Sequence, residues 1–112
     1  MRALLRRRAP GATEHLRCGD VTMDALAHEV RRGDRLVDLT ALEFELLQYF
    51  LRHPRQVLSR SQLLEAIWGA DAETTSNVVD VYVGYLRAKL EEGGATRVIR
   101  TLRGVGYVIR SD

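Results

Sequence analysis

The sequence has one cysteine and no long apolar run, and these two absences exclude several classes of protein. Cys18 has no second cysteine to pair with, so an internal disulfide is excluded and a zinc site is disfavoured. No run of about eighteen apolar residues could cross a bilayer, and the first residues lack the apolar core of a secretory signal. We therefore expect a cytoplasmic protein that binds neither a membrane nor a metal.

The sequence motifs of common enzymes are also missing. The three histidines, His15, His28 and His53, fall in different segments, and no HExxH, GxSxG or glycine-rich phosphate loop occurs. Histidines scattered in this way are typical of surfaces and helix ends rather than of an active site. We therefore expect no enzyme, no catalytic residue and no cofactor.

What the sequence does contain is the composition of one globular domain with an uneven distribution of charge. The 112 residues are 46% hydrophobic and 29% charged, with a formal net charge of +2. Residues 93–110 hold four arginines and no acid, whereas residues 65–80 hold four acids and no base. A polyanion could bind the first stretch and would avoid the second.

The chain divides into a short basic segment and one folded domain. The proline and glycine within residues 9–13 break any helix, so residues 1–15 are predicted to lie outside the domain, which spans 16–112. Short apolar runs separated by turn residues then predict a small antiparallel sheet. Its strands are expected at residues 16–18, 21–23, 27–30 and 36–39.

Three helices and a hairpin are expected next. Thr40 with Glu43, and Ser59 with Gln62, form capping boxes, whose side chains satisfy free amides at a helix start. A third helix over residues 76–91 has an apolar line that predicts its buried side: Val79, Val83, Leu86 and Leu90. Two β-rich runs at residues 98–109 predict a hairpin around glycines that could simply supply a positive φ.

The opposite side of the third helix carries little charge. Its outward positions are expected to be Asn77, Val81, Gly84, Tyr85 and Ala88. Exposed helix faces are usually charged, whereas amide, apolar and small side chains suit the major groove of DNA. The same face could instead pack on another protein domain or on the N-terminal sheet. The hairpin favours DNA, because Arg103 at its tip could enter a narrow minor groove and Thr101 could bind a phosphate.

Three long segments resemble the C-terminal effector domain of the OmpR/PhoB family of response regulators: LTALEFELLQYFLRHPRQVLSRSQLLEAIWG, SNVVDVYVGYLRAKL and VIRTLRGVGYVI. The resemblance implies an α+β fold, a winged helix-turn-helix with an N-terminal four-stranded antiparallel sheet, three helices and a C-terminal β-hairpin wing. It also implies that residues 1–15 are the end of a receiver-domain helix and the interdomain linker. The receiver domain itself lies outside this sequence.

The resemblance further implies sequence-specific binding of double-stranded DNA and regulation of transcription. By position, base contacts fall at Asn77, Val78, Val81, Tyr82 and Tyr85. Backbone contacts fall at Arg87, Thr101 and Arg103, to which we add their neighbours Lys89 and Gly104. The loop 69–75, with Trp68, Asp71 and Glu73, resembles the segment that touches RNA polymerase. Two domains are expected to bind direct-repeat half-sites as a dimer, controlled by the receiver domain and indirectly by a sensor histidine kinase.

The recognition face departs from the family at positions where many members carry arginine or threonine. This chain has Asn77, Val78, Gly84 and Tyr85 there, so an arginine–guanine pair is not implied. We therefore predict a readout that depends mainly on adenine and thymine contacts and on DNA shape.

Overall fold

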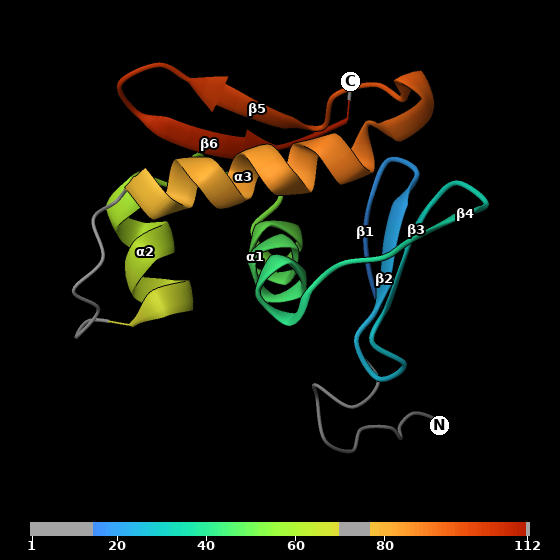
Figure 1. Ribbon diagram of the computed structural model, residues 1–112. Coiled ribbons are helices and arrows are strands. Elements are labelled where there is room, and N and C mark those ends of the chain that lie inside the picture. The colour runs from blue at the N-terminus through green and yellow to red at the C-terminus, as the bar shows by residue number, and fades with distance from the viewer. Residues whose placement is uncertain (1–14, 70–76, 112) are drawn as a thin grey trace, which may run out of the picture.

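The computed structural model describes residues 15–69 and 77–111, which form a four-stranded sheet, three α-helices and a C-terminal hairpin (Figure 1). The sheet pairs β1 (His15–Cys18), β2 (Val21–Asp24), β3 (Glu29–Arg32) and β4 (Arg35–Val37) antiparallel in sequence order. The hairpin consists of β5 (Ile99–Leu102) and β6 (Gly106–Ile109). The predicted α+β architecture is therefore confirmed.

The third strand begins two residues later than the sequence predicts. Asp24 Oδ1 accepts a hydrogen bond from Ala27 N at 3.1 Å, and His28 N donates to Ala25 O at 3.3 Å. A side chain that bonds the backbone locally competes with strand pairing, so residues 25–28 form a turn. The predicted bounds 27–30 were wrong for this reason. The fourth strand also ends early, at Val37 rather than at residue 39.

Both predicted capping boxes are present. Glu43 N donates to Thr40 Oγ1 at 3.3 Å while Thr40 N donates to Glu43 Oε1 at 2.9 Å. The same two bonds join Ser59 and Gln62, at 3.1 and 2.8 Å. They begin α1 (Ala41–Arg52) and α2 (Arg60–Trp68), because they satisfy amides that have no partner inside the helix.

Helix α1 lies at the centre of the fold and contacts β1, β6, α2 and α3 (Asn77–Leu90) (Figure 1). The predicted buried line of α3 is confirmed, since each of its four residues is at most 1% exposed. Phe44 of α1 is buried as well. The hairpin supplies Ile99, Tyr107 and Ile109 to the same core. One side of α3 is thus packed against the domain and the other is left outside.

Candidate nucleic-acid interface

The outer face of α3 is exposed as predicted. All five outward positions, Asn77, Val81, Gly84, Tyr85 and Ala88, are exposed, with Val81 at 40% and Tyr85 at 52%. No charged residue is among them. The helix therefore presents an amide, an apolar side chain, an aromatic ring and two small residues to its surroundings.

Two other predicted base-contacting residues lie on the shoulder of this face. Val78 and Tyr82 are half-buried and pack against the core cluster. The Tyr82 ring meets Trp68 edge-on at 5.5 Å between centroids and Tyr85 at 5.3 Å. These contacts form a row of three aromatic rings that begins at Trp68 on α2 and ends at Tyr85 on α3. Asp71 and Glu73, predicted with Trp68 for a polymerase contact, lie outside the described residues.

The tip of the hairpin is an exposed turn beside α3. Val105 N donates to Leu102 O at 2.9 Å, which closes the turn, and Gly104 has a φ of +76°. A positive φ at this position favours glycine because a side chain would be strained. Arg103 and Gly104 are exposed at the tip, and Thr101 is exposed on β5.

Strand β6 is attached, close to the hairpin turn, to the segment that precedes α2. Leu58 and Tyr107 exchange two backbone hydrogen bonds of 2.8 and 2.9 Å. Gly106 makes this approach possible, since a Cβ there would overlap Leu58 O and lie 2.9 Å from Ser59 Cα. The sequence suggested only a turn role for this glycine, whereas its structural role is close backbone contact.

Asp80 connects α3 with both α2 and the hairpin. Its Oδ1 accepts hydrogen bonds from Arg60 Nε at 2.8 Å and from the Tyr107 hydroxyl. Burial alone would raise the pKa of Asp80, but these two hydrogen bonds outweigh it and hold the pKa below its ordinary value. The carboxylate is therefore charged at neutral pH and fixes the hairpin relative to α3. No pattern in the sequence pointed to this role of Asp80.

Arg87 also joins α3 to the hairpin. Its Nε donates to Ile99 O at 2.8 Å, another guanidinium nitrogen donates to Thr101 Oγ1, and its charge lies 5.5 Å from the centre of the Tyr107 ring. The predicted phosphate contacts of Arg87 and Thr101 remain predictions. In this structure the pair holds the hairpin edge beside α3.

Lys89 forms an ion pair across to α1. Its Nζ lies 2.6 Å from Glu43 Oε1, the same oxygen that caps α1. Burial would raise the pKa of Glu43, but Lys89 and Thr40 together keep it below its ordinary value. Because Glu43 balances its charge, Lys89 is the least suited of the predicted backbone residues to hold a phosphate.

Two arginines of the N-terminal sheet close the C-terminal end of α3. Arg32, only 6% exposed, donates to Leu90 O at 3.1 Å, to Thr96 Oγ1 at 2.8 Å and to Asp20 Oδ1 at 2.7 Å. Arg35 donates to Leu90 O at 3.2 Å and to Lys89 O at 3.3 Å. Cations at a helix C-terminus satisfy its free carbonyls and offset its partial negative charge. The sheet therefore fixes the orientation of α3.

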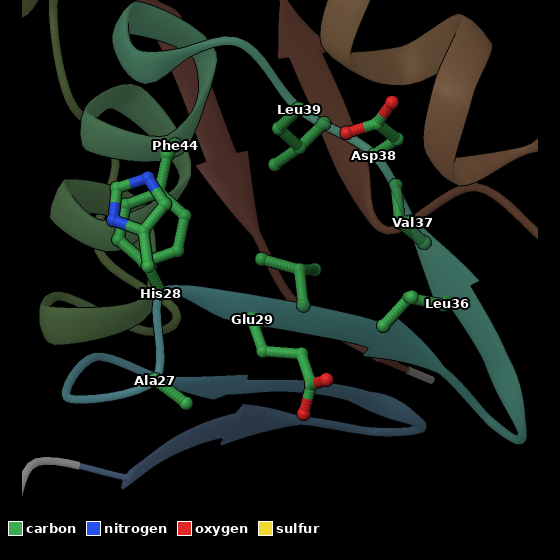
Figure 2. A pocket seen from close by; sticks show the side chains of 9 residues that line it. Ala27, His28, Glu29, Leu36, Val37, Asp38, Leu39 and Phe44 are labelled. Carbon is green, nitrogen blue, oxygen red and sulfur yellow. The ribbon is translucent and has the colours of Figure 1, made fainter.

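A separate hollow of about 430 Å³ lies between the N-terminal sheet and the start of α1 (Figure 2). Within it the rings of His28 and Phe44 stack with centroids 3.7 Å apart. Its lining includes the carboxylates of Glu29 and Asp38, contains no lysine or arginine, and includes no residue of α3 or the hairpin. This hollow does not suit a phosphate backbone and is distinct from the exposed face of α3.

Residues 15–69 and 77–111 offer neither a cluster of metal ligands nor a membrane-spanning helix. In these ranges no group of three or more His, Cys, Asp or Glu residues could hold a metal ion. No helix there is long and apolar enough to cross a membrane. Cys18 is buried, and burial raises the pKa of its thiol, which disfavours the reactive thiolate.

The chain is similar to a family of transcriptional regulatory proteins and to response regulators. Residues 33–109 match the family described as "Transcriptional regulatory protein, C terminal". The chain is 51% identical to the response regulator MprA of Mycobacterium tuberculosis over 113 residues, covering 98% of this chain and 49% of that protein. For the response regulator MprA of Mycolicibacterium vanbaalenii the identity is 49% over 114 residues, with the same coverages. The chain thus spans about half the length of these curated relatives.

Solved structures share the fold. The RstA DNA-binding domain of Klebsiella pneumoniae, in complex with the RstA box, has a TM-score of 0.76 at 28% identity, covering 87% of this chain and 97% of that one. The DNA-binding domain of the response regulator AdeR, in complex with an intercistronic region, has a TM-score of 0.73 at 27% identity, covering 82% and 95%. Both similarities extend over nearly the whole of the compared domain.

Proposed function

The chain belongs to the family of C-terminal domains of transcriptional regulatory proteins, the DNA-binding output domains of OmpR/PhoB-type response regulators, and from this we propose a specific use of its surface. Helix α3 enters the major groove of a double-stranded DNA site, while the β5–β6 hairpin binds the adjacent backbone and minor groove as a wing. The observation that carries the proposal is the exposed, uncharged face of α3 beside a basic hairpin.

The base contacts are assigned by exposure. Asn77 can pair bidentately with adenine, and Val81 can touch a thymine methyl group. Tyr85, which is half exposed, completes this central set. Val78 and Tyr82, on the shoulder, would reach bases only at the edge of the contact. Direct readout would then depend mainly on adenine and thymine, and enrichment of an invariant guanine opposite α3 would contradict this assignment.

The wing supplies the backbone contacts. Arg103 at its tip would enter the minor groove, where a narrow groove concentrates negative potential. Gly104 allows close approach of the backbone, and the Thr101 hydroxyl would bind a phosphate. Arg87 and Lys89 would support these contacts chiefly by holding the wing and α1 in place.

The first test measures binding and its salt dependence. Duplexes are enriched from a random-sequence pool, and fluorescence anisotropy gives the affinity for an enriched and a scrambled duplex at 50 and 200 mM salt. The logarithm of affinity should fall with that of salt with a slope of about 0.9 per neutralised phosphate. Absence of enrichment would contradict DNA recognition, and salt-independent association would indicate an apolar protein interface instead.

Three single substitutions should separate the two kinds of contact. Arg103→Ala is expected to weaken binding to enriched and scrambled duplexes alike. Asn77→Ala and Tyr85→Ala should mainly reduce discrimination, by roughly 1–3 kcal/mol for each lost base contact. Equal losses on both duplexes from all three variants would show that these roles are wrongly assigned.

Gly84→Ala should raise stability while it weakens DNA binding. Gly84 is exposed in the middle of α3, with no atom within 4 Å of an added Cβ. Glycine in a helix costs roughly 0.5–1 kcal/mol relative to alanine, so urea denaturation should show a more stable variant. The added methyl group would stand between the helix and the base edges. If the variant were more stable and its DNA affinity unchanged, this part of α3 would not belong to the interface.

Further roles are proposed for the longer protein. We propose that it is a cytoplasmic response regulator, not an enzyme, in which a receiver domain controls this domain and a sensor histidine kinase acts indirectly. Two copies would bind direct-repeat half-sites as a dimer. The segment from Trp68 through Asp71 and Glu73 would contact RNA polymerase, since its acidity suits a protein partner better than DNA.

A further inference from the structure

A basic groove lies on the face of the hairpin that turns away from the core. Ile99, Tyr107 and Ile109 belong to the core cluster, so the alternating positions of the two strands face outward. On that side is a hollow of about 460 Å³ whose lining includes no acidic residue. We call it the outer-hairpin groove and define it by the residues around Val108: Arg55, Arg97, Arg100 and Arg110.

The backbone brings these arginines together from separate segments. The strand register places Arg100 opposite Val108. Arg110 N donates to Val98 O and Arg55 N donates to Ile109 O, both at 2.9 Å. Arg97 is paired with Glu91 at 2.9 and 3.3 Å, so its charge is partly balanced. The backbone of the hairpin and of the segment around Arg55 thus places these arginines around one groove.

The groove is continuous with the wing tip. Thr101 and Leu102 line it and lead along β5 directly to Arg103. A strand rises about 3.3 Å per residue, so Arg100 and Arg103 lie roughly 10 Å apart along the chain. One strand of DNA carries about three phosphates over that length. Arg100 and Arg103 could therefore contact different phosphates of the same DNA strand.

We propose that the outer-hairpin groove binds the sugar-phosphate backbone of the duplex beyond the wing, so that DNA contact extends past the half-site read by α3. This inference rests on the proposed function. Guanidinium groups bind phosphate oxygens in a bidentate manner and are weakly hydrated, which suits a groove with an apolar floor. An acidic protein would meet the same charge, but the continuity with Arg103 favours the same duplex.

The test compares duplexes of three designs. One ends at the edges of the enriched sequence, and the others extend it by about ten base pairs, one helical turn, at either end. Anisotropy gives the affinity of the unchanged chain, of the R55A/R110A double variant and of R17A/R31A. The last is the matched control, because it loses the same charge from exposed positions of the N-terminal sheet.

Extension at one end only should strengthen binding by the unchanged chain. Each added phosphate contact should increase the loss of affinity between 50 and 200 mM salt by roughly 3.5-fold, from a slope of about 0.9. R55A/R110A should lose this advantage and R17A/R31A should keep it.

Two results would overturn the inference: no gain from either extension, or a gain that R55A/R110A retains. In the second case the added DNA contact would come from another part of the surface. In both cases sequence enrichment and the effect of Arg103→Ala would leave the proposed function standing. Failure of the proposed function would appear separately, as absence of enrichment.

Discussion

Replacing Gly106 with alanine is expected to destabilise the domain by roughly 3 kcal/mol and to abolish most of its DNA binding. The added Cβ would overlap Leu58 O and lie 2.8 Å from Leu58 C, so the backbone of β6 must move away. That movement breaks the two hydrogen bonds between Leu58 and Tyr107, worth about 1 kcal/mol each, and adds the strain of overpacking. Urea denaturation measures the stability, and anisotropy measures the affinity.

Gly84→Ala is the matched control for the stability measurement. It adds the same methyl group where no atom lies within 4 Å, and it should shift the free energy of unfolding in the opposite direction. If Gly106→Ala left both the stability of the domain and the position of the wing unchanged, the contact with Leu58 would not be what holds the wing in place.

Replacing Arg32 with methionine is expected to cost roughly 2–4 kcal/mol of stability and to loosen the last turn of α3. Its hydrogen bonds to Leu90, Thr96 and Asp20 are lost, and bonds to charged groups contribute about 1.5–3 kcal/mol each. The loss is partly offset, because Arg35 still donates to Leu90 O and Asp20 is exposed enough to be hydrated. DNA affinity should fall as well, since the C-terminal end of α3 is no longer fixed.

Amide hydrogen exchange tests the local part of this expectation. Exchange of the amides around Leu90 should become faster in Arg32→Met, whereas the amides in α1 should change only with global stability. Arg31→Ala is the control, because Arg31 is the exposed neighbour on β3. Equal effects of the two substitutions would contradict a specific role of Arg32 in closing the helix.

The parts of the molecule that follow local rules agreed with their prediction. Both capping boxes, which begin α1 and α2, and the buried line of α3 depend on residues three or four apart in the sequence. The exposed face of α3 followed from the same helical periodicity. The start of β3 was missed because Asp24 forms a turn there that alternation of apolar residues does not reveal.

Candidate site residues were harder to assign than the face on which they lie. Arg87 was predicted to contact the DNA backbone from its position in the family, and Lys89 was added as its neighbour. The structure shows an intramolecular partner for each, the hairpin for Arg87 and Glu43 for Lys89, and their phosphate contacts remain predictions. The pairing of Lys89 with Glu43 could not be predicted from either residue alone. Glu43 was already assigned to the cap of α1, and it lies 46 positions from Lys89 in the sequence.

The sequence by itself determined the type and order of the elements and which side of α3 is free, because hydrophobic periodicity and capping act over a few residues. Only the tertiary structure decided how α3 and the wing are held: Arg32 reaches Leu90 across 58 positions, and Gly106 meets Leu58 from another segment. Such contacts join residues that are far apart in the sequence and become neighbours only in the folded chain. A pattern that spans a few residues does not show which distant residues will become neighbours.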